Sequence, residues 1–341
     1  MAIIVQNTQR LIKPDVYDIL GPDYKHDRAK IYNRLKKGPN PPNAVLYQYP
    51  FRTPVEPSNA GSPEGVLWQA SDATSKSNRD LMYGRCHHRT TRFGVGEVSE
   101  GNEVFGTGGA SNFDEEMDLH LEYQINSAER IIIGEQESSA GNGTDSFTTR
   151  GLEKLILDTA NIALQTDSAT VVPAAFRPTA DQVQSLSISG GDYTLTEDAL
   201  MAPLEAIYNA LLAELDLDLY CTTRFKKKIS KFGTFTANVT DYTVVRRFNQ
   251  DAADKKMTAV IDTYTGDCGT VRAEKHPYLR RSTDQKAEAI GVDYSYMSLR
   301  VRQAPTAVEL KDEGSGRRGM TKQTFGLQAI PTYFCQFRRN D

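Results

Sequence analysis

The sequence predicts an α+β protein that combines one compact unit of helices and strands with long extended segments. Three observations support this fold class. Pro or Gly interrupts the first 43 residues at seven positions, so no long helix can form there. One long apolar stripe at helical spacing runs through residues 113–133. From Arg150 onward, helix and strand patterns alternate as they do in an α/β unit.

Composition and charge exclude several classes of protein. The chain has 341 residues, of which 39% are hydrophobic and 25% charged, and its net charge is −4. That balance excludes a generally basic nucleic-acid binder. The charge is unevenly spread, because residues 1–52 carry +5 and residues 300–341 carry +4, which leaves −13 for the middle. Such an arrangement suits a protein with one face near an anion, and solvated ends explain it equally well.

Targeting signals and cysteine frameworks are also not indicated. The four cysteines lie far apart, without the spacing of a zinc ribbon or a disulfide framework, and we expect them to be reduced. The N-terminus lacks the pattern of a signal peptide. No apolar run approaches the roughly 20 residues that span a bilayer, so we expect a soluble protein.

Residues 1–43 resemble an arm more than a domain. Only Asp27–Lys37 favours a short basic helix, with Ile31 and Leu35 on one face. An arm of this kind cannot cover its own apolar side chains and needs another surface to lie on. The apolar residues concerned are Ile3, Ile4, Val5, Leu11 and Ile12.

Residues 44–101 read as extended chain. AVLYQYPF, GVLWQA and RCHHRTTRFGVGEV favour strands, and PVEPSNAGSPEG between the first two is rich in turn residues. The pattern predicts a long hairpin-like excursion with few residues for a core. We therefore expect both the arm and this excursion to be ordered mainly by contacts between subunits.

The long stripe predicts one helix from Phe113 to Ile133. Asn112 is the expected N-cap and Glu115 completes a capping box, and further acids occupy the first turns, where the helix dipole favours negative charge. The side chains of the stripe recur at spacings of four and three. They are Met117, Leu121, Ile125, Ala128 and Ile132.

From Arg150 the pattern predicts a first amphipathic helix over residues 152–163. A second helix begins at Thr194 or Thr196, with Pro203 expected to kink it or delay its start. LDLYCT favours a buried strand, TRFKKKISKF a short basic helix, and the stretch around Gly266–Gly269 two strands with a tight turn. The final run, TKQTFGLQAIPTYFCQFRR, reads as one long extended segment.

Few residues are candidates for metal binding. Cys86, His87 and His88 are adjacent, but successive strand residues face opposite sides, so the three cannot converge on one ion. His120 lies four residues after Glu116 on the predicted helix, where a lone histidine usually fills a surface or interface position. A second isolated histidine, His276, precedes a proline in a loop, with no partner that the sequence identifies.

Catalytic motifs are equally scarce. GTGGAS at 106–111 precedes a helix, but it lacks the P-loop and dinucleotide spacings, and the acids that follow it would repel phosphate. The basic run at 224–231 fits an amphipathic helix with a solvated side, or a contact to DNA or to an acidic neighbouring subunit. We therefore expect a protein that is not an enzyme, with no catalytic, cofactor-binding or metal-binding residues.

The order of these elements resembles the Hong Kong 97-type fold of tailed-phage major capsid proteins. The resemblance extends over residues 83–341 and rests on several segments in the right order. These are RTTRFGVGEVSEG with FDEEMDLHLEYQINSAERIIIGE, RGLEKLI, YTLTEDALMAPLEAIYNALL with LDLYCTTRFKKKISKF, and GMTKQTFGLQAIPTYFCQFRR. Residues 44–82 are longer and richer in proline than the corresponding loop of the family, and Pro203 interrupts a helix that the family leaves whole.

The resemblance implies a division of the chain into named parts. These are an N-terminal arm (1–43), an E-loop (44–101), a spine helix with the first part of a peripheral P-domain (102–149), an axial A-domain (150–303) and a returning P-domain strand (304–341). Some relatives cross-link covalently through a lysine, an asparagine and an acid. Lys76 near Asn78 is suggestive of that chemistry here.

The implied function is structural. Copies of the chain would form hexamers and pentamers of an icosahedral head around double-stranded DNA, with a portal and a decoration protein as further partners and no membrane. The head would assemble in the host bacterial cytoplasm and become the virion capsid. The basic ends would contribute to the inner face through Lys25, Arg28, Lys30, Arg34, Lys36 and Lys37. The alternatives are an encapsulin-like shell around cargo enzymes, and a non-viral α/β binding module or an enzyme.

Overall fold

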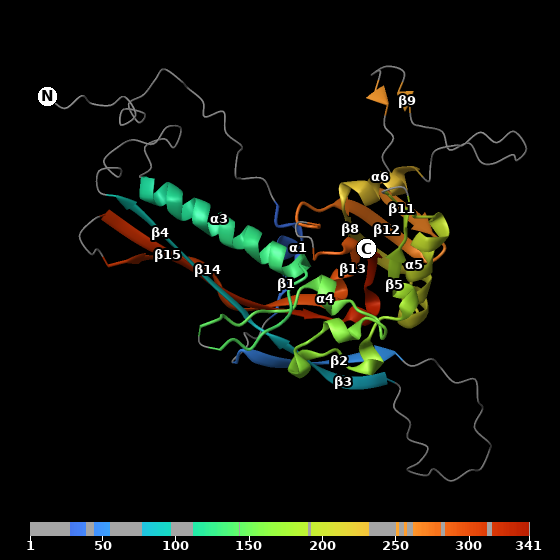
Figure 1. The fold of residues 1–341 in the computed structure, drawn as a ribbon, viewed down its shortest axis with the longest axis horizontal. Coiled ribbons are helices and arrows are strands. Elements are labelled where there is room, and N and C mark those ends of the chain that lie inside the picture. The colour runs from blue at the N-terminus through green and yellow to red at the C-terminus, as the bar shows by residue number, and fades with distance from the viewer. Residues whose placement is uncertain are drawn as a thin grey trace, which may run out of the picture.

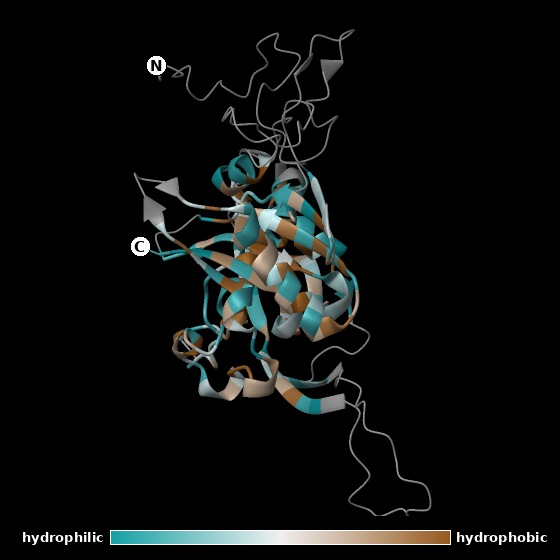
Figure 2. Ribbon diagram, turned by 90° about the vertical axis from the view of Figure 1, so that its right-hand side faces the viewer, coloured by the Kyte–Doolittle hydropathy of each residue, from teal (hydrophilic) through white to brown (hydrophobic). Residues whose placement is uncertain are grey.

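A computed structural model gives the fold of most of the chain (Figure 1). The residues that it describes are 28–38, 44–54, 77–96, 112–142, 144–189, 192–231, 250–251, 256–257, 262–280, 284–311 and 316–340. Hydrophobic segments concentrate in the body of the molecule, where sheet and helices stack (Figure 2).

The larger sheet has six strands and mixes parallel with antiparallel pairing. In spatial order its strands are β11 (Thr263–Gly266), β12 (Gly269–Lys275), β8 (Leu215–Cys221), β13 (Ala287–Val292), β16 (Cys335–Arg339) and β5 (Val183–Leu186). The central strand β8 pairs in parallel with β12 and antiparallel with β13. Every residue of β13 is buried, as expected of a strand that is covered on both faces.

Helix α5 (Glu197–Leu211) packs on this sheet against β5, β8 and β16. The hydroxyl of Thr196 accepts a hydrogen bond from the backbone N–H of Ala199 at 3.2 Å, which confirms the later of the two predicted starts. Pro203 lies inside the helix and is buried. The helix therefore begins before the proline and continues through it.

Helix α6 (Thr223–Lys231) packs against β12 and β13. Phe225 and Ile229 are buried on its apolar side, as predicted. Lys226 is buried as well, because its ammonium group pairs with the Asp262 carboxylate and donates to the carbonyl of Ala273 at 2.8 Å. The predicted basic helix is confirmed, but Lys226 does not belong to its solvated side.

A second sheet of four strands forms a long ribbon. Its strands, in spatial order, are β1 (Lys36–Lys37), β14 (Met297–Leu310), β15 (Gly316–Ala329) and β4 (His87–Gly96). Helix α3 (Asn112–Ile133) lies along this ribbon (Figure 1). The Gln124 side chain donates to the hydroxyls of Thr91 and Thr321, on β4 and β15, at 3.2 and 3.0 Å.

The predicted long helix is confirmed almost to the residue. Ala128 and Ile132 are buried, whereas Met117, Leu121 and Ile125 are half-buried, so the stripe is better covered toward the C-terminal end. Asn112 is the first helical residue. The capping box stays a prediction, because the side chains of Asn112 and Glu115 lie outside the part of the structure that is described.

The remaining elements are short. The helices among them are α1 (Lys30–Arg34) and α4 (Leu152–Leu155). The strands form three antiparallel pairs, which are β2 (Leu46–Pro54) with β3 (Ser77–Arg85), β6 (Ile188–Ser189) with β7 (Asp192–Tyr193), and β9 (Gln250–Asp251) with β10 (Lys256–Met257). The 3-10 turns are η3 (Ile162–Leu164), η4 (Ser168–Thr170), η5 (Ala174–Phe176), η6 (Ala180–Gln182), η7 (Tyr294–Tyr296) and η8 (Pro331–Tyr333). The tight turn between β11 and β12 is confirmed by the pairing of Gly266 with Gly269.

The prediction of a helix over residues 152–163 is wrong. Only α4 is helical, and a 3-10 turn follows at η3. The amide of Gln165 donates to the carbonyls of Lys154 and Leu155 at 2.7 and 3.3 Å, and these acceptors would otherwise bond the next helical turn. In addition, residues 152–158 are all buried except Lys154, so the burial does not follow one face of an amphipathic helix.

The last run of the chain is not one extended segment. It divides at η8 into β15, which belongs to the ribbon, and β16, which belongs to the six-stranded sheet. Pro331 opens the turn, since proline cannot supply the N–H that a continuing strand needs.

Residues 44–101 are likewise not a single hairpin. β2 pairs with β3 in one hairpin, and after Cys86 the chain continues as β4, which pairs with β15. GVLWQA and the turn-rich tip lie outside the described residues.

The arm is tied to its own chain where the structure describes it. Ile31, Tyr32 and Leu35 are buried against the rest of the protein. In the hairpin, Tyr49 and Met82 are buried as well. Contacts within one chain therefore supply part of the order of these segments, and the larger share expected from contacts between subunits stays a prediction. The other apolar residues of the arm, from Ile3 to Ile12, lie outside the described residues.

Candidate assembly surfaces and their support

A buried carboxylate joins the arm, the long helix and the larger sheet. Glu129 of α3 is fully buried, and its two oxygens accept the backbone N–H groups of Ile31 and Tyr32 at 2.8 and 2.7 Å. His276, which follows β12, places Nε2 at 2.6 Å from the same carboxylate. Its Nδ1 accepts the N–H of Tyr278 at 3.3 Å, so the proton lies on Nε2 and is donated to Glu129.

These hydrogen bonds satisfy the Glu129 carboxylate, which would be costly to bury without partners. Two segments distant in sequence from α3 supply the donors, so the three segments depend on one another for their positions. No local pattern identifies a partner for His276, because the contact spans 147 residues. A charged residue on the apolar side of the predicted helix, at Glu129, was the one available signal.

Two of the six basic residues expected at the inner face instead contact acids of the same chain. The Lys30 ammonium lies 2.5 Å from a carboxylate oxygen of Glu274, and Arg34 pairs with Asp218 at 3.4 Å. Lys30 and Arg34 are thus paired within the chain, and the DNA-facing role of all six residues stays a prediction. Of the other four, Lys36 and Lys37 are exposed, Arg28 is half-buried and Lys25 lies outside the described residues.

An ion-pair network fixes the base of the hairpin. Arg85, at the end of β3, donates through Nε to the Asp167 carboxylate at 2.6 Å, and the Ser138 and Thr170 hydroxyls also donate to it, at 2.9 and 3.1 Å. The hydrogen bond from Arg85 is the main reason that the pKa of Asp167 is lowered to about 2. The hairpin is thus attached at its base to the segment that joins η3 and η4.

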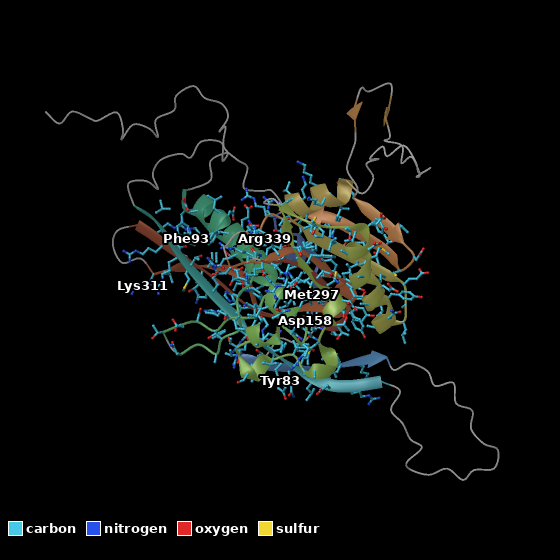
Figure 3. All side chains as sticks on the ribbon, turned by 45° about the vertical axis from the view of Figure 1, so that its right-hand side comes forward. Tyr83, Phe93, Asp158, Met297, Lys311 and Arg339 are labelled. Carbon is cyan, nitrogen blue, oxygen red and sulfur yellow. The ribbon has the colours of Figure 1, made fainter. Side chains whose placement is uncertain are left out.

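The hairpin has one covered and one open face. Tyr47 and Tyr49 point inward, and their hydroxyls donate to the carbonyls of Leu327 and Ala329 on β15. Leu46, Leu81 and Tyr83 alternate with the buried residues and are 37–40% exposed. Tyr83 lies at the outer edge of the molecule (Figure 3). An exposed apolar face on a two-stranded hairpin is a typical contact surface for a partner.

A second open surface follows the side of α3. A groove of about 660 Å³ is lined by residues of α3, the arm and β4. Its floor includes Tyr123, which is 52% exposed and has the guanidinium of Arg89 over its ring at 5.1 Å. His120 lies in the groove and pairs with Glu116 at 3.8 Å, a helix surface pair as expected.

The adjacent Cys86, His87 and His88 do not meet in the fold. Cys86 is buried and its pKa is raised to about 11 by burial, which keeps the thiol neutral. Burial lowers the pKa of His87 to about 4, and His88 places Nδ1 at 2.8 Å from the Thr324 hydroxyl. Across the described ranges, no three His, Cys, Asp or Glu side chains are grouped to hold a metal ion.

Other sequence candidates have different outcomes. The basic run at 224–231, with Phe225 on its apolar side, forms α6. GTGGAS, Lys76 and the side chain of Asn78 lie outside the described residues. No helix in the described part of the chain is long and apolar enough to cross a membrane.

Comparison with known proteins decides the family. The sequence model of the SU10 major capsid protein matches residues 60–333, which is most of the chain. The chain belongs to the SU10 major capsid protein family. Its function is therefore structural, as a capsid protein of a phage virion that assembles into a multimeric shell. This match confirms the predicted family and does not favour the encapsulin-like alternative.

Solved structures support the fold of the capsid protein along the whole chain. A chain of Mycobacterium phage Bobi is 15% identical, with a TM-score of 0.51, and each chain covers 100% of the other. A chain of the capsid of cyanophage P-SCSP1u is 12% identical over 98% of this chain and 94% of that one, with a TM-score of 0.55. A chain of the capsid of a native GTA particle is 11% identical, with full coverage of both chains and a TM-score of 0.58. No protein of curated function matches the sequence.

Proposed function

We propose that this capsid protein is built and assembled in the Hong Kong 97 manner. In this proposal α1 closes the N-terminal arm of residues 1–43, β2 and β3 form the base of the E-loop within 44–101, and α3 is the spine helix. The six-stranded sheet with α5 and α6 is the A-domain, and the ribbon of β4, β14 and β15 is the P-domain. The topology supports moving two boundaries, since the ribbon begins at Met297 and β16 returns to the A-domain sheet.

The family match carries this proposal, and the open faces of the hairpin and of α3 support it. Copies of the chain form hexamers and pentamers of a closed icosahedral head, joined by a portal and by a decoration protein. The shell assembles in the cytoplasm of the bacterial host and acts without catalytic residues.

Within the head, we propose weak contacts to packaged double-stranded DNA from exposed basic residues that pair with no acid of the described chain, above all Lys36 and Lys37. Such contacts are independent of base sequence and weaken as salt rises. An overall acidic chain suits this role, because a strongly basic lining would hold the genome too tightly to release it.

Electron microscopy of the purified full chain tests the proposal. We expect closed, regular shells with hexameric and pentameric units, alone or with co-expressed portal. A chain that stays monomeric or forms small oligomers under all ionic conditions would contradict it. Shells from infected cells that contain protein cargo and no nucleic acid would contradict the genome-enclosing role alone.

A further inference from the structure

The two ends of strand β8 differ in charge. Residues 205–214 and 266–271, at the end where β8 begins, contain three acids and no Lys or Arg. Residues 222–231, at the end where β8 finishes, contain five basic residues and no acid. Seven residues of extended strand separate the two groups by about 20 Å. The six-stranded sheet is therefore bipolar along its central strand.

The acidic end forms a corner that we call the acidic corner, defined by Glu205, Leu212, Glu214 and Asp267. Leu215 donates its N–H to the carbonyl of Cys268 at 3.0 Å, which brings the end of α5 beside the β11–β12 turn. Burial and the nearby carboxylates of Glu205 and Asp267 raise the pKa of the Cys268 thiol. The three acids are exposed, and none has an ion-pair partner within the described part of the chain.

Apolar surface accompanies these acids. Leu212 caps α5 with a left-handed backbone (φ 57°) and is 51% exposed, and Tyr208, one turn earlier, is 39% exposed. The left-handed backbone is costly for a leucine, and about half of its side chain finds no cover in the described part of its own subunit. The acidic corner thus presents carboxylates around a projecting apolar tip.

The opposite end of β8 offers a complementary surface that we call the basic hollow. It is a depression of about 450 Å³, and its lining includes Arg224, Arg280 and Arg339. Lys227 is exposed on the adjoining turn of α6. Glu288, the buried acid of the hollow, accepts a hydrogen bond from the Thr222 hydroxyl at 2.7 Å and forms an ion pair with Arg280 at 3.1 Å. The surface is therefore positive.

We propose that the acidic corner of one copy seats against the basic hollow of the next copy around each capsomer axis. The inference rests on the proposed function, because copies around a rotation axis meet through two different faces and not through one face shared by both. Bipolar charge provides such a pair of faces within one chain. It also sets the direction of the ring, because two acidic corners repel each other and so do two basic hollows.

Charge-swap variants of the full chain test the contact. Arg224→Glu and Glu214→Arg each place like charges across the interface, and we expect each to lower the rate of shell formation, measured by light scattering and electron microscopy, about tenfold or more at low salt. The double variant restores opposite charges in swapped order, and we expect it to assemble within about threefold of the parent. Asp181→Arg, an equal reversal at an exposed site away from both ends, is the matched control and should assemble normally.

Each result has a definite meaning. Single variants that assemble like the parent, or a double variant that fails although its unassembled form melts with the parent, would overturn the contact. So would an Arg224→Glu variant that forms normal shells but packages less DNA, because the basic hollow would then face the genome. A parent chain that forms no shells would contradict the proposed function itself, whichever result the variants give.

Discussion

The six-stranded sheet and the ribbon of β4, β14 and β15 are stabilised in different ways. In the sheet, all six residues of β13 are buried, and helices α5 and α6 supply cover from the same chain. In the ribbon, α3 covers one face, and β14 alternates between half-buried and exposed residues beyond Val301. The sheet therefore carries its own core, whereas the outer ribbon has a face that the described residues leave open.

The open face of the ribbon has a definite composition. Met320 pairs across the ribbon with Arg92 on one side and with Val308 on the other, and directly paired residues share a face. Val308 is 44% exposed. A mixed apolar and basic face of this kind is suited to partner contact and gives little to the stability of one subunit. Four predictions test the difference between the two regions.

The largest effect is expected in the sheet. Phe337 on β16 is fully buried and packs against Phe225 of α6, with ring centroids 5.0 Å apart. Phe337→Ala should lower the free energy of unfolding by about 3–5 kcal/mol, because it leaves a cavity that the close-packed sheet cannot fill. Chemical denaturation of the unassembled subunit measures this. A loss below about 1 kcal/mol would contradict the claim that the sheet carries its own core.

The junction between the two regions should rank next. Glu129→Ala leaves the N–H groups of Ile31 and Tyr32 and the His276 ring without their acceptor, so we expect a loss of about 3 kcal/mol. Glu129→Gln keeps one acceptor oxygen and should cost less. Equal losses for the two variants would show that packing, and not the hydrogen bonds, holds the arm in place.

The base of the ribbon should respond to pH through His87. Burial holds its pKa at about 4, below the ordinary 6.5, so the unfolded chain binds the proton more readily. Stability that is complete above pH 6.5 should therefore fall by about 2–3 kcal/mol as the pH drops toward 4. His87→Gln should remove this part of the pH dependence. A parent and a variant with parallel stability curves between pH 7 and 4 would exclude the effect.

The smallest effect on the subunit is expected on the open face. Val308→Ser should change the free energy of unfolding by less than about 0.5 kcal/mol, since the side chain is already largely in water. The same variant should slow assembly if a partner covers this face. A loss near that of Phe337→Ala would mean that the ribbon is supported within one chain after all.

The sequence anticipated the elements whose signals are local. The stripe of α3, the Thr196 cap of α5 and the two-residue turn between β11 and β12 all depend on neighbouring residues, and all three elements formed as predicted. The capsid family also followed from the order of such elements. The prediction of a helix over residues 152–163 was wrong because the Gln165 amide, ten residues after Leu155, donates to carbonyls that a continuing helix would use as acceptors.

Contacts between distant segments could not be predicted in this way. The pairing of β4 with β15 joins residues more than 200 positions apart, and nothing in the alternation of RCHHRTTRFGVGEV distinguishes it from a hairpin strand. The burial of the arm beneath Glu129 and His276 depends on the same kind of contact. For Lys30 and Arg34, sequence gave the charge but not the acids that face them.

Hydrogen exchange, measured on unassembled subunits and on closed shells, tests the central comparison most directly. We predict that β8 and β13 are strongly protected in both states, and that the hairpin β2–β3 and the outer half of β14 gain protection only in the shell. Equal protection of hairpin and ribbon in the two states, or a six-stranded sheet that becomes protected only on assembly, would contradict the account.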